Sequence, residues 1–394
     1  MFSDRIAHNL TRNRLTQAVE AMRAAQKPYI DLTESNPTRA GFHYPSDLLQ
    51  PLAQPRALTY EPSPLGALGA REAISREYAR QQIDVAPDRI VLTASTSEAY
   101  SILFKLLAGA GDEVLVPRPS YPLFDHLTRL DLVVPRPYDL ECHGAWSIDF
   151  SSIERALSPR TRAVLVVSPN NPTGSFVTGP ELDRLAALCA DRGVAIVADE
   201  VFADYALEPG AADRAGRAAR CVDALTFALG GLSKSLGLPQ VKLGWVAVGG
   251  PDVLAAEALE RLELICDTYL SVATPVQLAA GTLIDRGVAV RREIASRVVA
   301  NYHYLKSSVG RAPACRVLQS EGGWYGVMQV PSLETEEDLV VGMLQTDGVL
   351  AHPGYFFDFP RESFVIVSLL PPEPTFADGI DRVLRHFACS ATNR

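Results

Sequence analysis

The sequence predicts an α/β protein with a large domain, whose mainly parallel sheet is covered by helices on both faces, and a smaller α/β domain. Three observations lead to this fold class. Short apolar segments alternate with helical patterns through the middle of the chain, these segments carry no polar face, and the pattern changes after Gly249. Strands that are apolar throughout are typical of a parallel sheet that is buried on both sides.

The predicted strands of the large domain are rich in Val, Ile and Leu. They are Arg89–Thr93, Glu113–Val116, Ala163–Val167, Val194–Ala198 and Ala224–Leu229. Helical patterns lie between them: Glu98–Leu107 follows Thr and Ser caps, and Pro180–Cys189 opens at a proline. In sheets of this kind, ligands bind at the carboxyl ends of the strands.

The pattern changes after residue 249, and a helix followed by a small mixed sheet predicts a second domain toward the C-terminus. The expected elements are helices at Asp252–Leu264 and Val288–Ser308, strands at Tyr325–Val330 and Ser363–Leu369, and a last helix near Phe376–Phe387. The first 45 residues contain a turn-rich segment and are expected to join the small domain or to cover the site. We therefore predict a large domain of residues 46–285 and a small domain of residues 1–45 together with 286–394.

Composition excludes several classes of function. The formal net charge of the 394 residues is −9, which argues against nucleic-acid binding because that needs a basic face. No apolar run is long enough to span a membrane, and the N-terminus has no signal core. The six cysteines are scattered without a CxxC pair, so we expect reduced thiols, no metal site and a cytoplasmic protein.

Lys234 is the first candidate for chemistry. It lies between two serines in the glycine-rich segment Gly230–Trp245, directly after a predicted strand. A primary amine at a strand end, among small residues that let a flat ligand approach, can form a Schiff base with an aldehyde cofactor. The structural alternative is a solvated surface lysine.

Three further segments suit the same chemistry, and each also has a purely structural explanation. Ser168–Gly174 (SPNNPTG) places the amide of Asn171 at a strand end, although such runs are also ordinary turns. Asp199 ends the next strand, where a carboxylate can pair with a pyridinium nitrogen or cap a turn. Thr93–Tyr100 forms a Ser- and Thr-rich turn before a helix, which suits a phosphate or a plain N-cap.

In this order, the four segments resemble the fold-type I pyridoxal-phosphate enzymes, and specifically the class I/II aminotransferases related to aspartate aminotransferase. The resemblance extends from about Tyr60 to Gly244 and continues more weakly to the C-terminus. It implies an aspartate aminotransferase-like fold and pyridoxal 5′-phosphate (PLP) as cofactor. It also implies transfer of an amino group from an amino acid to an α-keto acid through an aldimine on Lys234.

The resemblance further implies a role for each matching residue. Lys234 and Asp199 match the catalytic residues, the aldimine lysine and the acid that pairs with the pyridine nitrogen. The cofactor-binding matches are Ser95, Thr96 and Ser97 at the phosphate turn, Ser233 before the lysine, Tyr121 stacked on the ring, Asn171 at the ring oxygen, and Tyr60 at the phosphate of a neighbouring subunit. Tyr60 thereby implies a homodimer with shared active sites.

Three positions depart from the family pattern. Lys242 stands where an arginine usually lies beside the phosphate, so the positive charge is kept but the bidentate fork is lost. Phe202 stands where a tyrosine usually donates to the ring oxygen. The segment 366–368 reads Ile-Val-Ser where the family has R-x-S, the clamp for the substrate α-carboxylate.

The lost clamp requires another positive group if the substrates are ordinary amino acids, because a buried carboxylate needs a partner. We expect Arg39, in the N-terminal segment SNPTRAG with Asn36, to contact the substrate. An ordinary solvated loop arginine is the alternative.

Two other functions are kept as alternatives. A PLP-dependent lyase, decarboxylase or cyclase that acts on an amino acid would share the early steps. A non-catalytic effector-binding module of the same fold is expected to carry a basic winged-helix domain ahead of the cofactor domain, and only about 45 residues precede that domain here. The sequence does not identify the amino donor, the acceptor or the pathway.

Overall fold

The computed structural model describes residues 3–6, 10–310, 312–332, 334–361 and 363–392. Its largest element is an eight-stranded sheet with the strand order β2-β9-β8-β7-β6-β3-β4-β5. The strands are β2 (Ile90–Thr93), β3 (Glu113–Arg118), β4 (Val134–Cys142), β5 (Trp146–Ile148), β6 (Thr161–Val167), β7 (Ala195–Asp199), β8 (Thr226–Gly231) and β9 (Gly244–Gly249).

The sheet is parallel in its middle and antiparallel toward its edges. Strands β4, β3, β6, β7 and β8 run parallel to one another, whereas the pairs β2–β9, β8–β9 and β4–β5 are antiparallel. Each of the five strands predicted for the large domain is present within a few residues of its expected bounds. The α/β class and the mainly parallel sheet are therefore confirmed.

Strand β4 was not predicted because it contains Pro135 and Pro137, and proline is rare inside paired strands. Both prolines lie opposite β3, at Val114 and Val116. On its other side β4 is paired with β5 only at residues 140–142. Proline is tolerated where one side of a strand has no partner.

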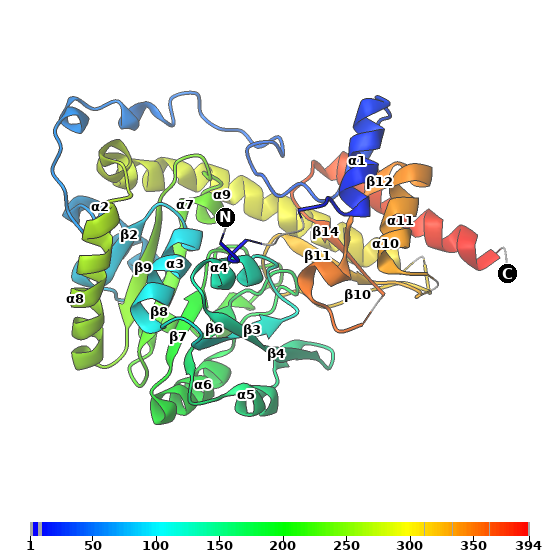
Figure 1. Ribbon diagram of the computed structural model, residues 1–394. Helices are drawn as coiled ribbons and strands as arrows, with labels where there is room; N and C mark the ends of the chain where they lie inside the picture. The colour runs from blue at the N-terminus through cyan, green and yellow to red at the C-terminus, as the bar shows by residue number, and fades with distance from the viewer. Residues whose placement is uncertain (1–2, 7–9, 311, 333, 362, 393–394) are drawn as a thin grey trace.

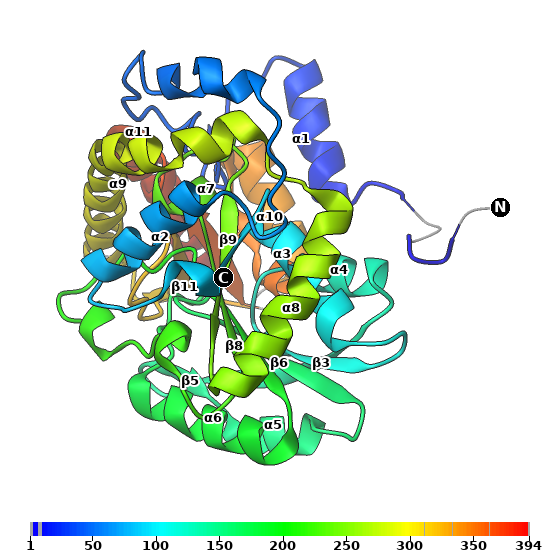
Figure 2. The same cartoon turned by 90° about the vertical axis from the view of Figure 1, so that its left-hand side faces the viewer.

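Helices cover both faces of the sheet, and successive strand residues contribute to two separate cores. Val164 and Val166 of β6 point into one core, and Ala163, Leu165 and Val167 into the other. Figure 2 shows α2 and α8 on opposite sides of β8 and β9. The helices of this region are α2 (Leu68–Arg80), α3 (Thr96–Leu107), α4 (Phe124–Leu130), α5 (Phe150–Ala156), α6 (Gly179–Arg192), α7 (Leu232–Ser235) and α8 (Asp252–Tyr269).

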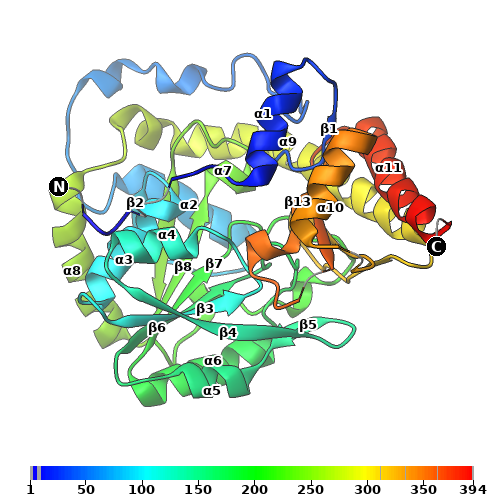
Figure 3. The same ribbon diagram turned by 45° about the vertical axis from the view of Figure 1, so that its right-hand side comes forward.

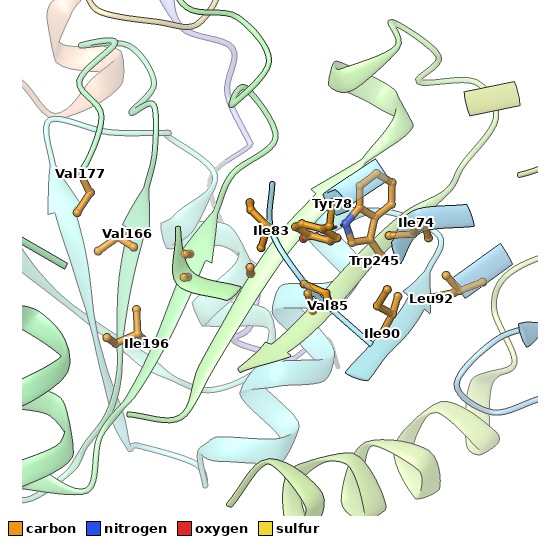
Figure 4. Close-up of a cluster of buried hydrophobic side chains, with 14 of the residues drawn as sticks. Ile74, Tyr78, Ile83, Val85, Ile90, Leu92, Val166, Val177, Ile196 and Trp245 are labelled. Atoms are coloured by element: carbon orange, nitrogen blue, oxygen red, sulfur yellow. Dashed lines mark hydrogen bonds between the residues drawn. The ribbon is translucent and has the colours of Figure 1, made fainter. Parts of the chain in front are cut away.

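The first core shows how the edge of the sheet is fixed. Trp245 of β9 is 5% exposed, and its indole nitrogen donates to the hydroxyl of Tyr78 on α2 over 3.2 Å. Ile74 and Ile90 surround the pair (Figure 4). This packing holds β9, and with it Gly244 at its start, against the carboxyl ends of the central strands.

A second, four-stranded antiparallel sheet has the order β10-β11-β14-β13. Its strands are β10 (Arg316–Val317), β11 (Tyr325–Gln329), β13 (His352–Pro353) and β14 (Phe364–Ser368), and β1 (Ile30–Asp31) pairs separately with β12 (Val349–Leu350). Helices α1 (Arg14–Ala24), α10 (Glu336–Gly342) and α11 (Glu373–Thr392) complete this part of the molecule (Figure 3). Through β1, the N-terminal segment returns to the C-terminal part of the chain.

Short helices lie in the connections between these elements. The 3₁₀ helices are Gln50–Leu52, Pro55–Leu58, Pro87–Arg89, Ala212–Arg214, Ala218–Arg220 and Gly354–Phe357, and a π-helix covers Met343–Asp347. Among the helices of the described residues, none is sufficiently long and apolar to cross a membrane.

Helix α9 (Thr274–Val309) is 36 residues long and links the two parts (Figure 1). Its first buried residues, such as Ile284, belong to the core under the large sheet, and those from Val290 onward belong to the core of the second part. The sequence predicted only the half from residue 288. The predicted domain boundary at residue 285 falls inside α9, and the division into two domains stays a prediction.

Candidate active site

A cavity of about 260 Å³ opens at the carboxyl ends of β6, β7 and β8. It gathers residues from the large sheet, from the N-terminal segment and from β11. Ten of the eleven predicted cofactor-binding residues line it; Tyr60 is the exception. The lining residues are Ser35, Ser95, Thr96, Ser97, Tyr121, Val167, Asn171, Asp199, Val201, Phe202, Gly231, Ser233, Lys234, Lys242, Leu243, Gly244 and Tyr325.

Lys234 lies on α7, a single helical turn that directly follows β8. Its Nζ is 5.0 Å from the ring centre of Trp324 and 5.7 Å from that of Phe202. Burial lowers the pKa of this ammonium group to about 8, although the nearby carboxylate of Asp199 raises it. About a tenth of the amine is therefore neutral at pH 7, far more than in an exposed lysine, and neutral amine is the form that attacks a carbonyl or accepts a proton.

Asp199 is the last residue of β7, and its side chain is buried. One carboxylate oxygen accepts a hydrogen bond from the Tyr100 hydroxyl over 3.1 Å, and the other accepts one from the backbone N–H of Val201 over 3.2 Å. Burial nevertheless raises the pKa of this carboxyl group to about 6. A cationic ring nitrogen beside Asp199 would favour the charged carboxylate again.

Tyr100 was missed in the sequence because Thr93–Tyr100 was interpreted only as a phosphate turn. Tyr100 follows Thr96 by four residues on α3, so both side chains lie on the same face of the helix. That spacing was the available signal. The helix thus supplies both the turn that lines the cavity and a hydrogen-bond donor to Asp199.

The opposite end of the cavity suits an anion. Ser95 caps α3 by accepting a hydrogen bond from the Glu98 N–H over 3.1 Å, and Thr96 and Ser97 form the first turn. The ammonium group of Lys242 lines the same cavity and has no ion pair or hydrogen bond to any described residue. Free backbone N–H groups at a helix N-terminus, together with an unpaired cation, form a phosphate site.

Gly244 leaves room for this site. A Cβ atom at position 244 would lie 3.0 Å from the carbonyl carbon of Ser95 and 3.2 Å from the backbone nitrogen of Thr96. Both neighbours are backbone atoms at the start of α3 and cannot rotate away. Any other residue at this position would therefore push the phosphate turn out of place.

Asn171 and Tyr121 line the middle of the cavity. The side-chain carbonyl oxygen of Asn171 is buried and has no hydrogen-bond partner among the described residues. Leaving a buried polar atom without a partner costs about 1–3 kcal/mol, so this amide is suited to a ligand that completes its bonding. Tyr121 lies edge-on to Phe124, with ring centres 6.1 Å apart.

The substrate end carries no arginine among its lining residues. Ile366 is fully buried in β14 and packs with Phe357, Phe359 and Phe364, so the position of the lost clamp is filled by an apolar cluster. The polar groups at this end are the hydroxyls of Ser35 and Tyr325. Neither residue was singled out in the sequence.

The structure places Arg39, Asn36 and Tyr60 outside the cavity lining. The guanidinium group of Arg39 is exposed and has no ion pair or hydrogen bond to a described residue. The side-chain oxygen of Asn36 accepts hydrogen bonds from Thr38 in a local turn, over 3.0 and 2.8 Å. Tyr60 is 70% exposed and lies in a separate surface pocket with Tyr269.

Comparison with known proteins identifies this arrangement. The family model described as aminotransferase class I and II matches residues 27–373. The chain belongs to this family. It is therefore a PLP-dependent aminotransferase, whose substrates are amino acids and keto acids, as the sequence motifs predicted.

Curated relatives of this aminotransferase are similar along most of their length. The alanine aminotransferase of Mycobacterium tuberculosis is 25% identical, with 90% of this chain and 84% of the relative covered. The glutamate-pyruvate aminotransferase of Escherichia coli is 26% identical, with 91% and 89% covered. The human tyrosine aminotransferase is 25% identical, with 96% and 87% covered.

Solved structures confirm the fold of this aminotransferase. The alanine aminotransferase of Pyrococcus furiosus superposes with a TM-score of 0.88 at 22% identity and covers 98% of this chain and all (100%) of its own. An aspartate aminotransferase double mutant from Thermus thermophilus has a TM-score of 0.81 at 22% identity, with 98% and 99% covered. The aspartate aminotransferase-like fold predicted from the sequence is thus confirmed.

The cavity of this aminotransferase fits PLP. The α3 N-terminus with Lys242 suits the phosphate, and Asp199 suits a pyridinium nitrogen. The buried side-chain oxygen of Asn171, which has no partner among the described residues, is available to a polar group of the ligand. Lys234 provides the amine. The described residues contain no cluster of three or more His, Cys, Asp and Glu side chains placed to hold a metal ion.

The raised pKa of Asp199 predicts how apoenzyme stability depends on pH. The folded state keeps a proton on Asp199 up to about pH 6, whereas the unfolded chain loses it near pH 4. Stability therefore falls as pH rises through this window, and the full cost above it is on the order of 2–3 kcal/mol. Asp199→Asn should stabilise the apoenzyme by this amount at pH 7.5 and by about half of it at pH 5.

Urea unfolding of both apoenzymes at the two pH values measures this difference. Asn keeps one oxygen that can accept the hydrogen bond of Tyr100 or Val201, and the difference between the two pH values separates the buried charge from the lost acceptor. An equal gain at pH 5 and pH 7.5 would show that the stabilisation does not arise from titration of Asp199.

Proposed function

We propose that this aminotransferase carries its cofactor on Lys234 and uses the same amine to move the proton of the substrate Cα. The observation that supports the proposal is the position of Lys234, largely buried at the end of β8 and electrostatically coupled to Asp199 within one cavity. The bound cofactor supplies an electron sink for the charge that develops on Cα.

Four residues of the cavity have defined tasks in this proposal. Asp199 holds a proton on the ring nitrogen, because a buried carboxylate and the cationic ring nitrogen opposite it would stabilise each other. Lys234 accepts the Cα proton, since its lowered pKa makes the neutral amine far more abundant near neutral pH than in an ordinary lysine. Asn171 donates to the ring oxygen, and Tyr121 covers the ring and excludes water.

The names of the relatives indicate which substrates to test first. Alanine, glutamate with pyruvate, and tyrosine appear in these names. The neutral substrate end, with Ser35, Tyr325 and buried Ile366, favours donors with an uncharged side chain. We propose that a small neutral amino acid is the donor and an α-keto acid the acceptor.

We also propose a homodimer in which Tyr60 reaches the phosphate of the neighbouring subunit. Leu58 is 91% exposed, Tyr60 70% and Tyr269 55%. Large apolar side chains that gather on one surface typically mark an interface.

The five cysteines with described side chains are unpaired, which supports a place in the reducing cytoplasm.

A half-reaction tests the function directly. Holoenzyme mixed with an amino acid, without keto acid, should convert its cofactor stoichiometrically to pyridoxamine phosphate; a lyase or decarboxylase would release other products.

Borohydride reduction and peptide mapping should place the pyridoxyl label on Lys234. Lys234→Ala should abolish turnover, whereas a label on Lys242 would refute the assignment.

The Phe202 position predicts a spectroscopic change. A tyrosine at this position would donate to the ring oxygen and favour its charged form, so Phe202→Tyr should lower the pH midpoint of the visible absorbance of the holoenzyme. Tyr205 does not take this role, because its hydroxyl donates to the carbonyl oxygen of Lys234 over 2.6 Å. An unchanged or raised midpoint would show that another donor, such as the unpartnered indole N–H of Trp324, already occupies the position.

Substitutions at Arg39 test whether this residue binds the substrate carboxylate. We propose that its unpaired guanidinium group moves over the cavity when substrate binds, since Ser35 of the same segment already lines it. Losing a charge-assisted contact of this kind costs on the order of 2–4 kcal/mol, so Arg39→Ala should lower kcat/KM by roughly two orders of magnitude. Arg39→Lys should recover only part of this loss.

The visible spectrum of the Arg39 variants serves as the control, because their cofactor site is unchanged. Wild-type kcat/KM in Arg39→Ala would mean that Arg39 is an ordinary loop residue. In that case, amines without an α-carboxylate become the substrates to test.

A further inference from the structure

The segment 232–237, called here the lysine turn, is held by side chains from three distant parts of the chain. The Tyr205 hydroxyl donates to the carbonyl oxygens of Lys234 and Ser235, over 2.6 and 3.2 Å. The Nε of Arg291 donates to the carbonyl of Ser235 over 3.0 Å. The Tyr44 hydroxyl donates to the carbonyl of Gly237 over 2.7 Å.

The lysine turn needs these donors because it cannot satisfy its own backbone. Helix α7 has only four residues, and the last carbonyls of a helix have no partner within it. Gly237 then reverses the chain with a φ of +64°, a conformation that favours glycine. A Cβ at this position would come within 2.9 Å of the Tyr44 hydroxyl, so the turn and its donor are closely fitted.

Arg291 is itself fixed. Its guanidinium group is 2.7 Å from the carboxylate of Glu77 and 3.4 Å from that of Asp204, and all three side chains are at most 10% exposed. Arg80 pairs with the same two carboxylates. A buried network in which every charge is paired restricts the positions of its members. The donor to Ser235 therefore has little freedom to move.

Two of the three donors lie on α9 and on the N-terminal segment. Arg291 lies on α9 between Val290 and Ile294, which both belong to the core of the second part. Tyr44 lies on the N-terminal segment that also carries Ser35, a residue of the cavity lining. The backbone of the lysine turn is thus bonded to elements that do not belong to the large sheet.

We propose that Tyr205, Arg291 and Tyr44 are positioning residues. They fix the backbone of the lysine turn so that the amine of Lys234 stays within reach of the substrate Cα while it is not bonded to the cofactor. A lysine side chain is a flexible four-carbon chain, so the position of its backbone helps to determine where the free amine can lie. The proposal rests on the function proposed for Lys234, and it adds that the position of α9 sets the position of the proton-transfer amine.

Tyr205→Phe tests the proposal because it removes two hydrogen bonds to the lysine turn and leaves the ring. The limiting rate of the amino-acid half-reaction should fall by about tenfold, with KM within about twofold of wild type, because the substrate contacts are unchanged. In the apoenzyme, the backbone amides of residues 236–238 should exchange with deuterium about fivefold faster. This second measurement does not depend on activity.

Tyr138→Phe is the matched control. The Tyr138 hydroxyl is equally buried and donates to a backbone carbonyl, that of Leu165, over 2.9 Å. Its loss should cost a similar amount of stability and leave both the limiting rate and the exchange of residues 236–238 at wild-type values. If Tyr205→Phe does not fold, Tyr44→Phe carries the test through the single bond to Gly237.

The outcomes separate this proposal from the proposed function. Equal limiting rates and equal exchange in Tyr205→Phe and Tyr138→Phe would overturn the positioning role, as would a loss confined to KM. If wild-type enzyme formed no pyridoxamine phosphate, the proposed function would fail. Exchange in the apoenzyme would still show whether these side chains hold the lysine turn.

Discussion

The burial of Asp199 beside Lys234 is the interaction on which the site depends. A carboxylate at the end of a fully buried strand is costly, and here its pKa rises to about 6. The amine opposite is also costly to charge, and its pKa falls to about 8. Strands β7 and β8 bring the two groups together at adjacent strand ends. Their opposite charges then offset part of both costs. The folded chain therefore holds a buried carboxylate that a cationic aromatic ligand would stabilise, next to an amine that is partly neutral.

The large-sheet part of the site could be predicted because strand ends are encoded locally. A run of Val, Ile and Leu that stops at Asp199 or just before Asn171 gives both the strand and the polar residue at its end. Parallel pairing then brings separate strand ends to one edge of the sheet. The order of the segments along the chain is enough to assemble the cofactor end of the cavity.

The remainder depends on contacts that no local pattern encodes. Ser35 and Tyr325 reach the cavity only because β1 and β11 pair with strands from the C-terminal part of the chain. Arg39 was expected beside the substrate, but its position is set by a loop and not by a sheet. Strand β4 was hidden by its two prolines, and the first half of α9 was not recognised before residue 288. Long-range pairing, which a single sequence does not show, decided the positions of Ser35 and Tyr325.

The length of α9 has a consequence for how the chain unfolds. At about 1.5 Å per residue, a helix of 36 residues spans roughly 54 Å and contributes buried side chains to two cores in succession. Melting of either core would remove the packing that keeps half of this helix ordered, and most helical stability in proteins comes from such packing. The two cores should consequently lose their structure in one cooperative transition, with neither persisting as a stable intermediate.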